Sequence, residues 1–120
     1  MLYALICYDS ESVVNAWGKD KDAAVMANHI GKMRQIAAKG RLGPVARLMQ
    51  TSTATTLRPG RQTVVLDGPF AETKEQLLGF YLVDCDSLDE ALKYGEQFMH
   101  ETGAIEVRPV QYFDTGSGGA

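Results

Sequence analysis

The fold is decided by a short run of sequence, Leu78-Gly79-Phe80-Tyr81-Leu82-Val83. Aromatic and branched residues dominate it, which predicts a β-strand. Because successive side chains of a strand point to opposite faces, Leu78, Phe80 and Leu82 share one face. Tyr81 and Val83 share the other. Both faces of this strand are therefore apolar.

The chain begins with a second run of the same kind, Met1-Leu2-Tyr3-Ala4-Leu5-Ile6-Cys7-Tyr8. An antiparallel sheet with helices on one face normally alternates apolar inward with polar outward residues, and neither run does so. An open apolar face would be larger than soluble monomers usually tolerate. We expect a second copy of the chain to cover it across a two-fold axis. The alternative is a ligand cavity on the second face of a monomer.

Two helices are predicted. Residues 9–19 are polar and are expected to form a loop. The acids Asp20 and Asp22 then favour the start of a helix, and Lys39-Gly40 favours its end. The second helix opens on the capping box of Ser87 and Glu90 and ends at Thr102-Gly103. Apolar residues recur at helical spacing in both. They are Met26, Ile30, Met33 and Ala37 in the first helix, and Leu88, Ala91, Leu92, Gly95, Phe98 and Met99 in the second.

The other strands complete an α+β order. Residues 41–48 predict an edge or bulged strand because Gly43 and Pro44 loosen it, and residues 105–110 predict the last strand. Residues 53–58 and 61–66 flank a turn and predict a hairpin. This order resembles the ferredoxin-like split βαβ arrangement, with both helices on one face of an antiparallel sheet. We expect one domain over residues 1–114 and a flexible Gly/Ser tail over residues 115–120.

The composition of the chain argues against several classes of binding partner. The net charge of the 120 residues is -3, with Lys and Arg scattered singly, so neither nucleic acid nor an anionic membrane is an expected partner. The apolar start is shorter than a membrane helix needs and lacks a basic leader. Cys7 and Cys85 are expected to be buried free thiols in a reducing cytosol rather than a disulfide. We expect no cofactor, and no metal site, because the two histidines and the scattered acids lack ligand spacing.

The sharpest local string is Asp67-Gly68-Pro69-Phe70-Ala71-Glu72-Thr73-Lys74-Glu75. It has a purely structural interpretation. Asp and Gly-Pro favour a tight turn, Phe70 could close one end of the core, and Thr73 with Gln76 could cap a helical turn. On that interpretation the segment is a connector.

The same string resembles the signature of the DGPF group within the YCII-related proteins. Residues 54–58 and 107–110 extend the resemblance over nearly the whole chain. It implies a dimeric α+β barrel of ferredoxin-like protomers, bacterial and cytoplasmic, with no settled activity. Relatives carry a helix histidine and an aspartate at a cleft, and are often encoded beside alternative sigma factors. His29 matches that histidine, but no acid lies between Arg41 and Leu66, so an aspartate after the second strand is not matched.

His29 is the candidate acid/base residue. It lies on the margin of the first helix's apolar stripe, where partial burial and a nearby carboxylate could set a pKa near neutrality. Asp9, at the end of the first strand, and Asp67 are the candidate partners. The alternative is a histidine that is only hydrogen-bonded or solvated. His100 is interpreted as a cation near a helix end.

Three further residues are candidates for substrate binding. Arg58 and Lys74 flank the hairpin and the Asp67 turn, and could bind a small carboxylate or phosphate. They could equally be solvated charges. Trp17 is either a lid over the cleft or an aromatic anchor at the dimer rim.

Two functions follow as hypotheses. The first is a small cofactor-free enzyme that performs acid/base chemistry on a small polar or carboxylate ligand in a dimer cleft, similar in architecture to lactone isomerases and small monooxygenases. The second is a non-catalytic ligand-binding or interaction module, associated with a sigma-factor regulatory system.

Overall fold

A computed structural model describes residues 1–116 of the chain. Its elements, in chain order, are β1 (Leu2–Asp9), α1 (Glu11–Ala16), α2 (Gly18–Ala38), β2 (Leu42–Arg47), a 3-10 turn (Thr51–Thr53), β3 (Thr55–Arg58), β4 (Val64–Asp67), β5 (Gln76–Asp84), α3 (Leu88–Glu96) and β6 (Ala104–Pro109). Of the tail predicted to be flexible, residues 117–120 lie outside the described part.

The main sheet has four strands in the order β2-β5-β1-β6. Every neighbouring pair is antiparallel. With β3 and β4 set aside, this is the ferredoxin-like order, so the predicted α+β fold is confirmed. β2 is an edge strand, and its register against β5 shifts between Leu42 and Val45, as expected of a strand interrupted by glycine and proline.

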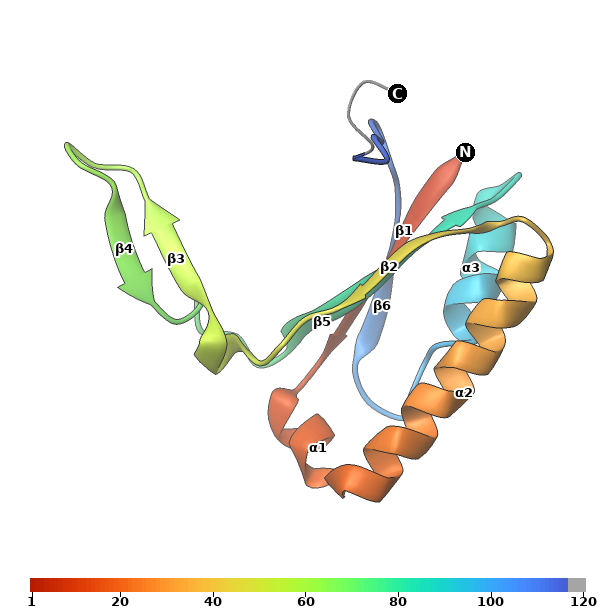
Figure 1. The fold of residues 1–120 in the computed structure, drawn as a ribbon, viewed down its shortest axis with the longest axis horizontal. Helices are drawn as coiled ribbons and strands as arrows, with labels where there is room; N and C mark the ends of the chain where they lie inside the picture. The colour runs from red at the N-terminus through yellow and green to blue at the C-terminus, as the bar shows by residue number, and fades with distance from the viewer. Residues whose placement is uncertain (117–120) are drawn as a thin grey trace.

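One face of this sheet carries the core. Leu5 of β1 lies opposite Tyr81 of β5, and both point toward the helices, α2 and α3, which lie on the same side of the sheet (Figure 1). Ile36 is the part of α2 that reaches the core. The buried core residues are Tyr3, Leu5, Ile36, Tyr81, Val83, Cys85, Ala91, Tyr94 and Phe98.

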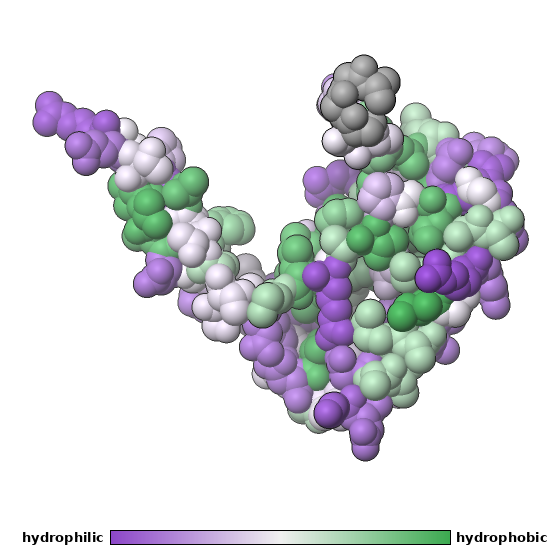
Figure 2. Space-filling model, in the orientation of Figure 1, coloured by the Kyte–Doolittle hydropathy of each residue, from purple (hydrophilic) through white to green (hydrophobic). Residues whose placement is uncertain are grey.

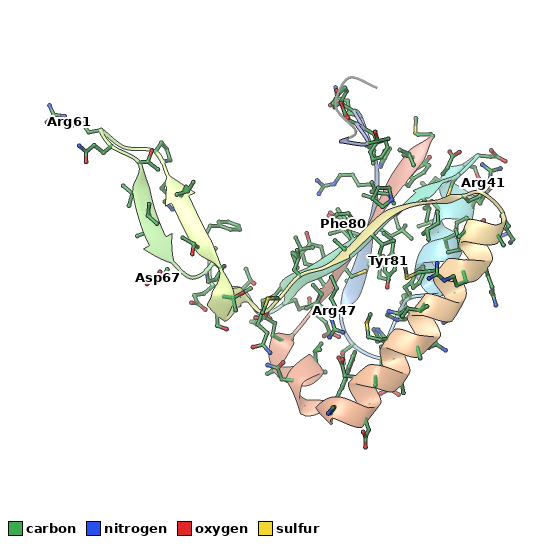
Figure 3. All side chains as sticks on the ribbon, viewed as in Figure 1. Arg41, Arg47, Arg61, Asp67, Phe80 and Tyr81 are labelled. Atoms are coloured by element: carbon green, nitrogen blue, oxygen red, sulfur yellow. The ribbon has the colours of Figure 1, made fainter. Side chains whose placement is uncertain are left out.

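The other face of the sheet is also apolar. Ala4 pairs with Leu82 and Ile6 pairs with Phe80 across β1 and β5. Because neighbours on a strand alternate, these side chains point away from the helices. Phe80 and Tyr81, labelled in Figure 3, illustrate the two directions on β5. The predicted apolar character of both faces is therefore present in the structure.

β3 and β4 form a separate two-stranded hairpin, as predicted. It projects from the body as an arm (Figure 1). Leu57 and Val65 are cross-strand neighbours on one face of the arm and are 67% and 63% exposed. Figure 2 shows this apolar patch beside a hydrophilic tip.

The polar stretch at residues 9–19 was predicted to be a loop, and this prediction is wrong. It contains α1 and the start of α2, with a break at Trp17. The carbonyl of Ser10 accepts hydrogen bonds from the N–H groups of Val13 and Val14, which starts the first turn. Glu11 then accepts a hydrogen bond from the backbone N–H of Thr51, which holds α1 against the chain after β2.

Both predicted helix stripes need correction. In α3 the buried ridge is Ala91, Tyr94 and Gly95, continued by Phe98 beyond the helix end at Glu96. The flanking positions Leu88, Leu92 and Met99 are exposed because they lie to either side of that ridge. In α2, Ile36 is the buried residue and Ile30 is 43% exposed. The N-terminal half of α2 contains no buried residue and is not packed tightly on the sheet.

Candidate functional site

The loose packing of α2 leaves a cavity of about 220 Å³ between this helix and the sheet. Met26, His29 and Met33, spaced by three and four residues along α2, line one wall. Tyr81 of β5 and Phe98, which follows α3, line another. Most of the lining side chains are apolar. The few polar groups in such a cavity are the ones that can orient a ligand.

His29 and Tyr81 form the main polar contact in this cavity. Nδ1 of His29 lies 2.9 Å from the hydroxyl oxygen of Tyr81. The rings of His29 and Phe98 form a T-shaped contact, with a centroid distance of 5.4 Å and an interplanar angle of 90°. Phe98 in turn stacks on Tyr81 at 4.0 Å. The rings of Tyr81 and Phe98 thus fix the orientation of the imidazole.

The environment of His29 disfavours its charged form. Burial, together with the smaller effects of the nearby charges of His100, Lys32 and Arg47, lowers the pKa of His29 from 6.5 to about 4. At neutral pH the imidazole is therefore neutral. A negative charge placed near it would favour its protonated form.

Tyr81 is also held in its neutral form. Burial raises the pKa of Tyr81, and with the opposing effect of the Arg47 guanidinium included the pKa is about 12. A neutral tyrosine hydroxyl beside a neutral imidazole forms a donor and acceptor pair in which either group can donate, depending on the tautomer. The pair can therefore pass a proton between its two ends.

His100 extends the ring cluster beyond His29 and also lines the cavity. It stacks on His29 with ring centroids 5.0 Å apart, and the indole of Trp17 meets it edge-on at 5.3 Å. Burial lowers the pKa of His100, and the charge of Asp9 opposes this shift. α3 ends four residues earlier, at Glu96, so the interpretation of His100 as a cation at a helix end is wrong.

Arg47 and Cys7 also line the cavity. The Arg47 guanidinium forms an ion pair of 2.7 Å with Asp22 of α2, which joins the helix to the edge strand. Burial raises the pKa of the Cys7 thiol to about 11, so this thiol stays protonated at neutral pH.

Asp9 also lines the cavity and is 3% exposed. Its two carboxylate oxygens accept hydrogen bonds from the backbone N–H of Ser10, at 2.7 Å, and from the hydroxyl of Thr102, at 2.9 Å. The structure thus brings Asp9, Trp17 and His29 to one cavity. Nδ1 of His29, however, forms its hydrogen bond with the hydroxyl of Tyr81.

Asp67, Arg58 and Lys74 lie elsewhere. Asp67 is exposed at the end of β4 and is labelled on the arm in Figure 3. Arg58 donates a hydrogen bond to the carbonyl of Phe70 at 3.0 Å, which holds the DGPF string against β3. None of the three lines the cavity described above. Their roles in binding or catalysis stay predictions.

Sequence reasoning missed Tyr81 and Arg47 as site residues. Tyr81 was assigned only to an apolar face of its strand. A signal existed, because a tyrosine among inward-facing residues must bring a hydroxyl that needs a partner. Arg47 faces the cavity because the register irregularity in β2 changes which side chains point inward, and that irregularity has no clear sequence pattern.

Residues 1–116 offer no support for two other kinds of function, metal binding and membrane crossing by a helix. They contain no group of three or more His, Cys, Asp and Glu side chains placed to hold a metal ion. Among these same residues, no helix has the length and apolar content required to cross a bilayer.

Comparison with known proteins places the chain in context. The family model of the YCII-related domain matches residues 1–114. An uncharacterized protein of Rhizobium meliloti (strain 1021) is 52% identical over 120 residues, covering 97% of each chain.

Proposed function

The chain belongs to the YCII-related family, and we propose that its α2 cavity binds a small polar or carboxylate ligand on which His29 and Tyr81 perform cofactor-free acid/base chemistry. The observation that carries this proposal is the contact of 2.9 Å between Nδ1 of His29 and the Tyr81 hydroxyl, inside a mainly apolar cavity. Such a cavity amplifies electrostatic interactions because little water screens them.

The pair suggests a simple proton path. A C–H or O–H group of the ligand gives its proton to the Tyr81 oxygen as the Tyr81 proton passes to Nδ1 of His29. The products are an imidazolium and a ligand anion, which stabilise one another by charge. Return of the proton to another atom of the ligand completes an isomerisation. Asp9, near His100, would help to hold positive charge in this part of the cavity.

A homodimer is part of the proposal. Its support is the apolar sheet face that carries Ala4, Ile6, Phe80 and Leu82, which the helices leave uncovered. Pairing of two such faces would bury them and stiffen β5, on which Tyr81 lies. We also propose a cytoplasmic location, supported by the free thiols of Cys7 and Cys85.

The test begins with a thermal-shift screen of small carboxylates, lactones and phosphonates, since a ligand that binds only the folded state raises its melting temperature. Each hit is then incubated in D₂O, and exchange of its acidic hydrogens is followed by proton NMR. His29→Gln and Tyr81→Phe should reduce the catalysed exchange by about 10²-fold or more.

Tyr112→Phe is the matched control, because Tyr112 is 80% exposed and lies outside the cavity. Exchange at the wild-type rate in His29→Gln would remove the pair from the mechanism.

A second candidate, an interaction module, is favoured by the arm. Its exposed Leu57 and Val65 lie side by side on a ribbon that projects from the body. The double variant Leu57→Ser and Val65→Ser should lose a partner that wild type captures after cross-linking in its host. Capture of the same partner by both proteins would count against a role for the arm.

A further inference from the structure

A shallow pocket of about 290 Å³ lies next to the cavity and shares His29 and His100 with it. Three polar residues of α2 line it, namely Lys21, Asn28 and Lys32. Their spacings of seven and four residues place them along one side of the helix. The chain after α3 supplies the other side, including the residue Gln97. The stacked histidines thus line both the apolar cavity and this second pocket, which also carries polar groups.

Two lysines, Lys21 and Lys32, line this second pocket. The ammonium of Lys21 lies 5.6 Å from the centre of the Trp17 ring, and Lys32 donates a hydrogen bond to the carbonyl of Gln97. These contacts hold both ammonium groups near His100. Each ammonium has three N–H donors, so donors remain for a ligand.

The surrounding charges also favour a negatively charged ligand. The charged groups that act on His29 and His100 are Lys21, Lys32, Arg47 and Asp9, in addition to the histidines themselves. Asp9 is the acid among them, and its oxygens already accept bonds from Ser10 and Thr102. Arg47 is paired with Asp22. The charge left for a ligand to balance is that of the two lysines.

From this arrangement we infer that the ligand is a small organic carboxylate, with an apolar ring or short chain in the cavity and its carboxylate between Lys21 and Lys32 beside His100. The inference rests on the proposed function and names the ligand class for that same site. A cavity of about 150 Å³ is enough to hold benzene. The observed 220 Å³ therefore suits a ring with a short side chain.

This assignment also explains how a histidine with a low pKa could act as a base. A carboxylate bound beside His100 would supply the negative charge that stabilises an imidazolium at His29. It differs from the expectation that Arg58 and Lys74 bind the anion, because those residues lie on or beside the arm, away from both pockets.

The test uses phenylacetate and its neutral analogue phenylacetamide as probes. The chain has one tryptophan, Trp17, and it lines the cavity, so quenching of its fluorescence reports binding there. Wild type should bind phenylacetate about tenfold more tightly than phenylacetamide, as expected for a charge-assisted contact. Raising the salt concentration should reduce this preference.

The double variant Lys21→Met and Lys32→Met should bind both probes equally, because it keeps the apolar stems and removes the charges. Lys19→Met is the matched control on the same helix, since Lys19 lines neither pocket, and it should keep the preference. The comparison of the two probes on wild type needs no variant, so misfolding of the double variant would not remove the test.

Equal binding of the two probes to wild type would overturn the inference while leaving the cavity as a ligand site. A fluorescence response to neither probe would also overturn it. Failure of the proposed function would appear separately, as hydrogen exchange that does not depend on His29.

Discussion

The hydroxyl oxygen of Tyr81 on β5 lies 2.9 Å from Nδ1 of His29 on α2, although the two residues are 52 positions apart in the chain. The contact exists only when α2 is docked on the sheet. It places two neutral, titratable groups in an apolar cavity, one with its pKa lowered to about 4 and the other with its pKa raised to about 12. Folding and formation of the candidate site are therefore the same event.

Removing the Tyr81 hydroxyl should weaken the fold modestly. Tyr81→Phe leaves Nδ1 of His29 without its partner, and we expect a loss of about 1 kcal/mol in the free energy of unfolding, measured by urea denaturation. Tyr112→Phe, on an exposed ring, should change it by much less. Equal effects of the two substitutions would show that the hydrogen bond contributes nothing to stability.

Phe98 should be among the most costly side chains to truncate. It is 1% exposed, stacks on Tyr81 and meets the edge of His29. Phe98→Ala should cost about 3–5 kcal/mol, a large fraction of the stability of a small domain. Phe70→Ala on the arm, where the ring is 74% exposed, is the control and should be close to neutral. A stable Phe98→Ala protein would contradict the packing described here.

A substitution at Gly103 tests how closely the chain at this residue packs against Tyr8 and Asp9. The φ of Gly103 is +82°, and a Cβ there would lie 2.3 Å from the carbonyl oxygen of Tyr8 and 2.8 Å from Cγ of Asp9. Gly103→Ala should therefore lower the melting temperature and move Asp9. Gly31→Ala, within α2 with open space around the new methyl group, should stabilise by about 0.5–1 kcal/mol. A melting temperature unchanged by Gly103→Ala would mean that the turn can relax.

Sequence predicted the sheet well because its signals are local and periodic. The two apolar runs became β1 and β5, the central strands, and the turn at Pro59-Gly60 became the tip of the arm. The site was only partly predictable. His29 was found from its place on a helix margin, but its partner Tyr81 is brought to it by tertiary packing. No local pattern encodes a contact of that kind.

The remaining misses have physical causes of their own. Residues 9–19 seemed too polar for helix, but hydrogen bonds from distant parts of the chain, such as that between Thr51 and Glu11, stabilise α1. Leu88 and Leu92 fit the helical period as well as the buried residues of α3, Ala91, Tyr94 and Gly95, do. Period alone does not say how wide a stripe a short helix buries.

The uncovered sheet face should make the protein a dimer. Sedimentation equilibrium of wild type at micromolar concentration should give twice the 13.1 kDa protomer mass. Phe80→Glu would place a charge in the centre of that face and should yield a folded protomer or an aggregate. Leu88→Glu, at the exposed start of α3, should leave the dimer intact. A wild-type protein that sediments as a stable protomer would contradict the proposed pairing.

The lowered pKa of His29 also predicts how stability changes with pH. The folded-state pKa of about 4 lies below the ordinary value of 6.5, so the unfolded chain binds more protons between these values. The stabilisation contributed by neutral His29 is present above pH 6.5 and is lost as the pH falls toward 4. Because the side chain is only partly buried, we expect a loss on the order of 1–2 kcal/mol. His29→Gln should flatten this part of the curve.

The most direct measurement is an NMR titration of the His29 imidazole in the ligand-free protein. The chain has two histidines, so His100→Gln assigns the signals. A cavity that keeps His29 neutral beside the Tyr81 hydroxyl predicts a pKa of about 4. A midpoint near the ordinary value of 6.5 would mean that water reaches the imidazole freely, and it would contradict the apolar proton-transfer site on which the proposed function depends.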